Sequence, residues 1–240
     1  MKRLLFQPKI WKNLYRSISP IIFPESCLMC NNELAASEEW VCSFCHGELV
    51  YTYFELHTEP TKLDQLFWGR VSFAGTYALL VFEKGKSSQK ILHALKYQSN
   101  PTVGVAFGKE IGRKIKLLEV FKDLDLLVPV PIHPKKEFVR GYNQSEQIAA
   151  GIAAVLSVKM DANFLKKQEH TESQTTRGKF ARWDNVVDNF ILKKGKQSIK
   201  HIALVDDVVT TGATLEALAR SIQKNYPDIR ISILSLAITK

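Results

Sequence analysis

The chain has 240 residues, of which 45% are hydrophobic and 24% charged, and these values are typical of folded globular proteins and exclude wholesale disorder. Lys and Arg number 33 against 24 Asp and Glu, and the net charge of +9 favours an anionic partner such as phosphate, nucleic acid or a membrane surface. No stretch of about 20 residues is free of charge, so we expect no membrane-spanning helix and a cytoplasmic protein.

Residues 1–22 are basic and rich in large apolar side chains. From Pro8 onward, Ile10, Leu14 and Ile18 recur every four residues, and this spacing predicts an amphipathic helix. Basic residues interrupt the apolar run and no small-residue cleavage site follows, so a secretion signal is not expected. We interpret the helix as packing on its own protein, with a position on a membrane surface as the alternative.

All the cysteines lie in two Cys-x-x-Cys pairs, Cys27 with Cys30 and Cys42 with Cys45. Two intervening residues let both thiolates of a pair face one metal ion, and two such pairs complete a tetrahedron. Disulfides or a redox couple are the alternatives, but a cytosolic compartment disfavours disulfides, and one redox pair leaves the other unexplained. We therefore predict a structural zinc ion in a small zinc-ribbon module with four cysteine ligands over residues 23–60, without an open coordination position for catalysis.

From about residue 69 to the C terminus, apolar strands alternate with helical patterns. Residues 50–68 show no clear period and are expected to form a connection. Strands are expected within 70–82, 124–132, 201–205 and 229–238, and helices over 87–97, 103–118, from residue 143 onward, and over 214–223. Strands that are apolar throughout and separated by helices predict a parallel α/β sheet with helices on both faces.

The most informative segment spans residues 202–215. An apolar strand leads into Asp206 and Asp207, then into a run of small and hydroxylated residues, and then into a helix. The carboxyl end of a parallel strand is where ligands bind, and the start of a helix presents free amides to an anion. Thr210, Thr211 and Thr214 add hydroxyl donors, and Gly212 lets the backbone approach an anion closely. This pattern predicts a loop that holds a phosphate monoester.

Two adjacent carboxylates beside a phosphate site are costly unless a positive or hydroxylated group takes them up. A ribose diol, with or without Mg²⁺, is such a partner for Asp206 and Asp207. Phosphate on one side and diol-binding carboxylates on the other describe a site for ribose 5-phosphate. The alternative is an acidic strand end that only caps the following helix.

Val205 to Thr214 resembles the phosphoribosyl pyrophosphate motif of the type I phosphoribosyltransferases. Together with the cysteine pairs, the chain from about Cys27 to Ala237 is similar to the ComF competence-protein family. Several further blocks match in order: Leu95-Lys96-Tyr97, Val128-Pro129-Val130-Pro131 with His133, Arg140-Gly141-Tyr142-Asn143-Gln144, and Gln174, Arg182 and Asn185 ahead of Phe190. The order of the blocks is more specific than any one of them.

This resemblance implies a type I phosphoribosyltransferase-like domain over 69–240, with roles assigned by position. Asp206, Asp207 and Arg140 would be the catalytic residues. Phosphoribosyl pyrophosphate would be bound by Asp206, Asp207, Val208, Val209, Thr210, Thr211, Gly212, Ala213, Thr214 and Pro131, with Lys135 and Lys136 as counter-charges to its pyrophosphate. The alternative for the two lysines is a solvated face. The charged segment with Arg177, Arg182 and Asn185 could be a substrate lid or a surface helix.

The same resemblance implies Mg²⁺-dependent pentosyl transfer and an association with DNA uptake. The rival interpretation is a non-catalytic module that binds single-stranded DNA or a helicase partner and uses the phosphate loop as a ligand sensor. Candidate base-stacking residues are Trp11, Trp40, Phe44 and Trp68, although packing explains each equally well. No motif in residues 70–84 identifies an acceptor.

Overall fold

The computed structural model describes residues 26–97, 100–167, 190–192 and 199–240. The chain divides into two compact units, residues 1–49 and 50–240. The predicted N-terminal helix and the charged segment with Arg177, Arg182 and Asn185 lie outside the described residues. In the part of the chain that is described, no helix combines the length and apolar character needed to cross a membrane.

The first unit is built around its cysteines. Cys27 and Cys45 are buried, and α2 (Ser43–Gly47) carries Cys45 on its buried side. The Glu38 carboxylate accepts hydrogen bonds from the amides of Ala35 (2.9 Å) and Ser43 (2.6 Å), which joins the two cysteine loops. Among the described residues of this unit, 26–49, the buried apolar side chains are Cys27, Met29, Val41, Cys45 and Leu49, which are too few for an ordinary hydrophobic core.

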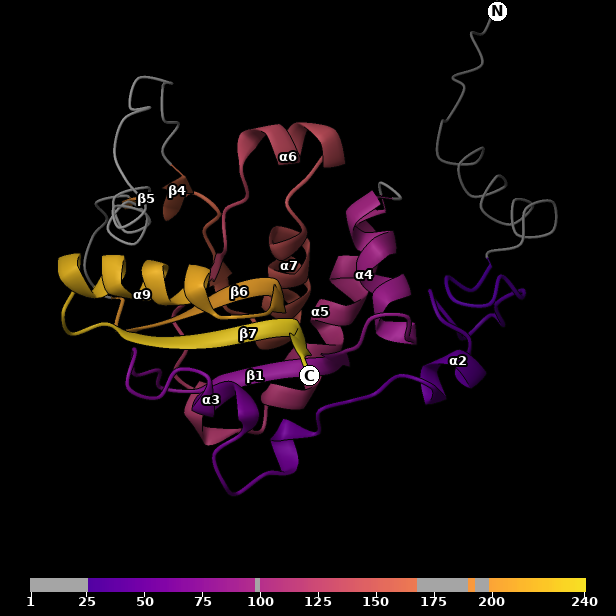
Figure 1. Cartoon of the computed structure of the whole chain (residues 1–240), viewed down its shortest axis with the longest axis horizontal. Coiled ribbons are helices and arrows are strands. Elements are labelled where there is room, and N and C mark those ends of the chain that lie inside the picture. The colour runs from indigo at the N-terminus through magenta and orange to yellow at the C-terminus, as the bar shows by residue number, and fades with distance from the viewer. Residues whose placement is uncertain (1–25, 98–99, 168–189, 193–198) are drawn as a thin grey trace, which may run out of the picture. The chain divides into compact units, whose positions relative to one another are not determined.

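The second unit contains a parallel five-stranded sheet in the order β1-β7-β6-β2-β3 (Figure 1). Its strands are β1 (Thr76–Phe82), β2 (Leu126–Pro129), β3 (Lys159–Met160), β6 (His201–Val209) and β7 (Arg230–Thr239). Its helices are α3 (Lys62–Gln65), α4 (Ser87–Tyr97), α5 (Pro101–Ile115), α6 (Pro134–Arg140), α7 (Gln144–Leu156) and α9 (Ala213–Asn225), with short 3-10 turns at Phe54–Leu56 and Glu119–Phe121. A separate antiparallel pair joins β4 (Leu165–Lys167) to β5 (Phe190–Leu192).

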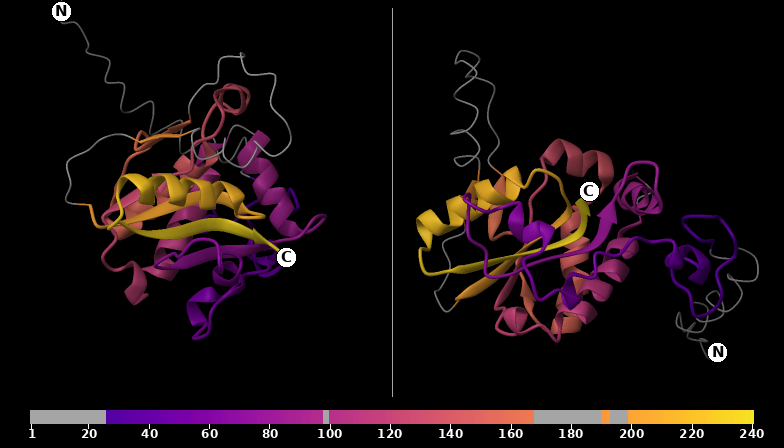
Figure 2. Two further views of the ribbon diagram at one scale, coloured as in Figure 1. Left: turned by 60° about the vertical axis from the view of Figure 1, so that its left-hand side comes forward. Right: turned by 60° about the horizontal axis from the view of Figure 1, so that its bottom comes forward.

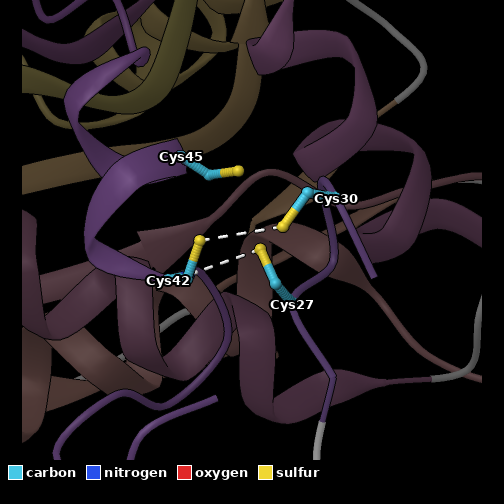
Figure 3. Close-up of side chains that lie close together, drawn as sticks. All are labelled: Cys27, Cys30, Cys42 and Cys45. Carbon is cyan, nitrogen blue, oxygen red and sulfur yellow. Dashed lines mark hydrogen bonds between the residues drawn. The ribbon is translucent and has the colours of Figure 1, made fainter. Parts of the chain in front are cut away.

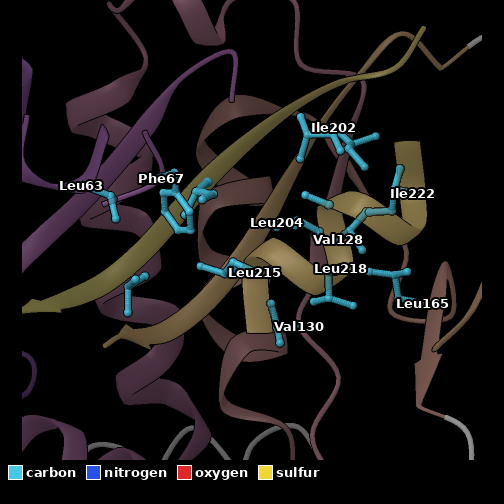
Figure 4. Close-up of a cluster of buried hydrophobic side chains, with 14 of the residues drawn as sticks. Leu63, Phe67, Val128, Val130, Leu165, Ile202, Leu204, Leu215, Leu218 and Ile222 are labelled. Carbon is cyan, nitrogen blue, oxygen red and sulfur yellow. The ribbon is translucent and has the colours of Figure 1, made fainter. Parts of the chain in front are cut away.

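Apolar side chains on both faces of the sheet explain its burial between helices. On one face, Leu215, Leu218 and Ile222 of α9 pack with Leu63 and Phe67 against the sheet (Figure 4). Helices α4, α5 and α7 pack against the sheet on its other side, as the two views in Figure 2 show. The predicted α/β fold class, with a parallel sheet flanked by helices and a small module around the clustered cysteines, is confirmed.

Glycines set the close packing of α5 on α7. A Cβ at Gly108 would lie 2.2 Å from the carbonyl oxygen of Ile148, and a Cβ at Gly151 would lie 2.2 Å from that of Val105. Because no side chain separates the helices there, their backbones touch. The contact fixes α7, whose first residues reach the carboxyl edge of the sheet.

The structure differs from the sequence prediction at three places that matter for the site. The expected connection over residues 50–68 contains α3, and Leu63 and Phe67 in it are buried in the core because their apolar side chains pack on the sheet. Strand β6 continues to Val209, so Asp206 and Asp207 lie within the strand, where Asp206 pairs with Ser235 of β7. The expected loop after Pro131 forms the short helix α6, because Pro134 occupies a favoured first-turn position and the His133 ring accepts a hydrogen bond from the Lys135 amide (3.1 Å).

Candidate ligand site at the carboxyl edge of the sheet

The loop between β6 and α9 has the chemistry of an anion cradle. Two of its carbonyl oxygens already accept hydrogen bonds. Arg70 Nη1 donates to the Thr211 carbonyl (2.9 Å), and the Glu216 amide donates to the Gly212 carbonyl (2.9 Å). Within the described residues, the amides of Thr210 and Thr211 have no acceptor, and the amide of Thr214 lies in the first turn of α9, where amides have no partner within the helix. The Ala213 amide donates to Thr211 Oγ1 (3.4 Å). Thr210, Thr211, Ala213 and Thr214 are exposed, so amides and hydroxyls at the start of α9 remain available to an anion.

The acidic doublet, Asp206 and Asp207, lies near the end of β6 and is partly buried. Asp206 Oδ1 accepts hydrogen bonds from the amide of Asp207 (2.8 Å) and from Ser145 Oγ at the start of α7 (3.3 Å). Asp207 Oδ2 lies 2.7 Å from Nζ of Lys96 on α4. Burial, and secondly the negative charge of Asp207, raise the pKa of Asp206 to about 7. The edge therefore holds two carboxylates in different electrostatic surroundings beside an anion cradle.

Three consecutive residues at the end of α4 join the parts of this site. The Leu95 carbonyl accepts a hydrogen bond from Tyr142 Oη (2.5 Å), and Lys96 pairs with Asp207. The Arg140 guanidinium lies over the Tyr97 ring, 5.8 Å from its centroid. Three separate sequence blocks, 95–97, 140–144 and 206–214, thus meet at one edge of the sheet.

Arg140 lies in the last turn of α6, and its Nη1 donates to Gln144 Oε1 (2.7 Å). Lys135 and Lys136, one turn earlier, are exposed, and Pro131 is partly buried where the chain leaves β2. In Figure 1, α6 stands above the start of α7 and beside the end of α4. Arg140 is therefore tied to the edge, whereas the two lysines project from it.

Several residues that support the site carried no signal in the sequence. The Phe67 ring backs Gly212, and Arg70 bridges the Thr211 carbonyl and the Glu216 carboxylate (Nε to Oε2, 2.8 Å). Ser145 follows a recognised block without belonging to it. These contacts join residues up to 146 positions apart, so spacing along the chain does not reveal them.

The cysteine cluster forms a second candidate site, in the first unit. The sulfur atoms of Cys27, Cys30, Cys42 and Cys45 all lie within 4.8 Å of one another and converge on one point (Figure 3). The distance from Cys30 Sγ to Cys42 Sγ is 3.7 Å. Tetrahedral Zn–S bonds of about 2.3 Å place sulfurs about 3.8 Å apart, so the arrangement fits a zinc ion.

The backbone around Cys27 favours a thiolate. Its sulfur accepts hydrogen bonds from the amides of Met29 (3.4 Å) and Cys42 (3.3 Å). Burial by itself would raise the pKa of Cys27, but amide hydrogen bonds outweigh it and lower that pKa to about 6. All four cysteines are free of disulfides. The cluster is thus a candidate metal site, as its spacing predicts.

Comparison with known proteins finds relatives that cover most of the chain. No family model matches the chain. It is 22% identical to competence protein F of Haemophilus influenzae over 82% of this chain and 90% of that protein. The ComF resemblance is confirmed. Proteins named DNA utilization protein YhgH are also similar, at 26% identity in Salmonella typhimurium and 22% in Escherichia coli K12, with 84% of this chain and 92% of each relative covered.

Among solved structures, the chain is similar to adenine phosphoribosyltransferase from Leishmania donovani. The match has 13% identity and a TM-score of 0.31, and it covers 70% of this chain and 85% of that one. The ComF-like blocks at 95–97, 140–144 and 206–214 are the ones that assemble the carboxyl edge. The contacts among these blocks, and not the structural match, are the basis for proposing a function.

Proposed function

We propose that the carboxyl edge of the sheet binds phosphoribosyl pyrophosphate with Mg²⁺, and that the protein acts in DNA uptake. One observation carries the proposal: the amides of Thr210, Thr211 and Thr214 and the exposed threonine hydroxyls of residues 210–214 lie directly beyond the acidic doublet on β6. A phosphorylated sugar presents a phosphate and a diol along one molecule, and the cradle and the doublet offer a partner to each. The relatives named for competence and DNA utilization support the second half of the proposal.

In this proposal each part of the site binds a different part of the ligand. Thr210, Thr211 and Thr214 bind the 5-phosphate with Gly212 between them, and the acidic doublet binds the ribose hydroxyls. Mg²⁺ would neutralise the charge that develops on the diphosphate. Arg140, with Lys135 and Lys136, supplies further positive charge for that group. With an acceptor present, its bond to C1 forms as the C1–oxygen bond to pyrophosphate breaks, so no protein nucleophile is required.

The test is isothermal titration calorimetry of the full chain with phosphoribosyl pyrophosphate and Mg²⁺. We expect saturable binding that falls at least tenfold in Asp206→Asn/Asp207→Asn, with a far smaller change in the surface control Asp228→Asn. A wild-type protein that releases no heat with this ligand, at concentrations where it is fully folded, would refute ligand binding. Pyrophosphate release with candidate acceptors then decides between an enzyme and a sensor.

A second candidate function, binding of single-stranded DNA, is favoured by the surface of α6. Phe138 and Val139 are 90% and 78% exposed, and Lys135 and Lys136 precede them on the same short helix. An exposed aromatic ring flanked by cations suits stacked bases and phosphates. The rival partner, a helicase, would use the same apolar and basic surface.

Fluorescence anisotropy with a labelled oligothymidylate tests this second function. Phe138→Ala should weaken binding severalfold, whereas Leu117→Ala, which removes another exposed apolar side chain, should not. Lys135→Gln/Lys136→Gln should also reduce the slope of the logarithm of the binding constant against the logarithm of the salt concentration by about 1.4. Equal affinity in wild type and Phe138→Ala would remove α6 as the DNA site.

We also propose that the cysteine cluster holds one structural zinc ion, and that the chain is organised as an N-terminal helix over 1–22, a zinc-ribbon module and a phosphoribosyltransferase-like domain. In this proposal the module ends at residue 49 rather than 60 and the domain begins at residue 50 rather than 69, because the chain divides between these residues. The fit of the sulfur positions to a tetrahedron supports the zinc ion. A structural role follows because four thiolates leave no position for a reacting water.

A further inference from the structure

The acidic doublet already has an internal cation. Lys96 Nζ lies 2.7 Å from Asp207 Oδ2, and the two side chains are only 21% and 15% exposed. Little water surrounds the pair, so its electrostatic attraction is stronger than that of a surface ion pair. Asp206 instead accepts neutral donors, Ser145 Oγ and the Asp207 amide. Lys96 is therefore the close counter-ion of the doublet among the described residues.

The backbone of Lys96 is held by contacts of the residues on either side of it. The preceding carbonyl, that of Leu95, is tied to Tyr142, and the following ring, that of Tyr97, lies under Arg140. A lysine ammonium sits on a flexible four-carbon stem and can change partner without moving its helix. Arg140, in the last turn of α6, places a second positive charge over the ring of Tyr97, the residue after Lys96. A ligand that approaches this region with a strongly anionic group thus meets two cations.

We propose that Lys96 is a displaceable counter-ion that holds Asp207 in the ligand-free protein and moves to the diphosphate when ribose hydroxyls take its place. The inference rests on the proposed binding of phosphoribosyl pyrophosphate. It adds Lys96 as a positioning residue that senses whether the ligand carries a diphosphate. A ligand with the sugar and the 5-phosphate alone must break the ion pair without replacing it, and so binds at a disadvantage.

Opposite effects on two ligands follow from this role. Ribose 5-phosphate has the hydroxyls and the 5-phosphate but no diphosphate, so it competes with Lys96. It should bind Lys96→Met about threefold to tenfold more tightly than wild type. Phosphoribosyl pyrophosphate gains the ammonium, so it should bind Lys96→Met about tenfold more weakly. A purely structural role for Lys96 would weaken both ligands together.

The experiment is calorimetry of the full chain with both ligands and Mg²⁺, on wild type, Lys96→Met, Lys96→Arg and the control Lys116→Met. Lys116 is exposed at the end of α5 and should change neither affinity. Lys96→Arg retains the charge and should restore most of the affinity for phosphoribosyl pyrophosphate. Affinity of Lys96→Met for ribose 5-phosphate equal to or weaker than that of wild type overturns the inference.

A thermal double-mutant cycle covers the case in which Lys96→Met is poorly folded. Asp207→Asn should then lose most of its effect on the melting temperature when Lys96 is already Met, because the two residues share one interaction. Additive effects would show that the pair does not form in solution and would overturn the inference. If wild type binds neither ligand, the proposed function fails, and the cycle still reports separately on the ion pair.

Discussion

The ring of Phe67 lies so close to Gly212 that a Cβ built on the glycine would stand 2.5 Å from Phe67 Cε1. Gly212 also has φ of +71°, a left-handed conformation that favours glycine. It is the residue immediately before α9, at the bend of the anion cradle. Two independent constraints, backbone conformation and close packing, therefore require a glycine at this one position.

Gly212→Ala should destabilise the protein by about 2 to 4 kcal/mol, because the left-handed backbone and the contact with Phe67 both become unfavourable. Affinity for phosphoribosyl pyrophosphate should fall with it. Gly85→Ala is the matched control: Gly85 has φ of +82°, but a Cβ at Gly85 would meet nothing within 4 Å. Only the backbone cost of about 1 kcal/mol then applies. Chemical denaturation measures both, and equal losses would contradict the packing argument.

Arg70→Lys should weaken ligand binding about tenfold while the sheet stays folded, because a lysine cannot replace both contacts of the arginine fork. Arg70 holds the Thr211 carbonyl and the Glu216 carboxylate together. Arg220→Lys is the control, since Arg220 also contacts Glu216 but is 50% exposed and does not contact the cradle. Calorimetry measures the affinity of both variants for phosphoribosyl pyrophosphate. Similar affinities of the two variants would argue against the bridge made by Arg70.

Asp206→Asn should make the ligand-free protein more stable at pH 7 to 8 than wild type. Burial, and then Asp207, raise the folded-state pKa of Asp206 to about 7, so the unfolded chain loses this proton more readily than the folded one. Wild type therefore loses stability as pH rises from about 4 to 7, and the variant lacks this pH-dependent loss. Melting temperatures should differ most at pH 7 and above and converge toward pH 4. A gap that does not change with pH would count against the raised pKa.

Metal analysis should find one zinc ion per chain, and a strong chelator should unfold residues 26–49 while the sheet unit remains folded. Residues 26–49 bury few apolar side chains, so we expect their fold to depend on the bound metal. Hydrogen exchange read by mass spectrometry distinguishes peptides from 26–49 and from 201–239. Cys45→Ser should lose the zinc, whereas His46→Ala, which alters an exposed neighbour, should keep it. Full zinc content in Cys45→Ser would remove that cysteine as a ligand.

Local patterns along the chain were enough to predict the class of fold and the two sites in outline. Apolar strands between helical periods predict the parallel sheet, and the helix expected over 87–97 is confirmed as α4. The paired spacing of the cysteines predicts their cluster, which the structure confirms. These features succeed because hydrophobic period, capping residues and ligand spacing are local properties of a sequence.

Only the tertiary structure decided which residues complete the edge. The pairing of Lys96 with Asp207, the hydrogen bond from Ser145 to Asp206 and the support of Gly212 by Phe67 join segments that are far apart along the chain. Helix α6 also replaced an expected loop. Such contacts depend on how α4, α7 and the segment before β1 pack on the sheet, and packing is a property of the whole core. The sequence alone therefore determined which chemical groups the protein contains, and the tertiary structure decided which of them lie together at the site.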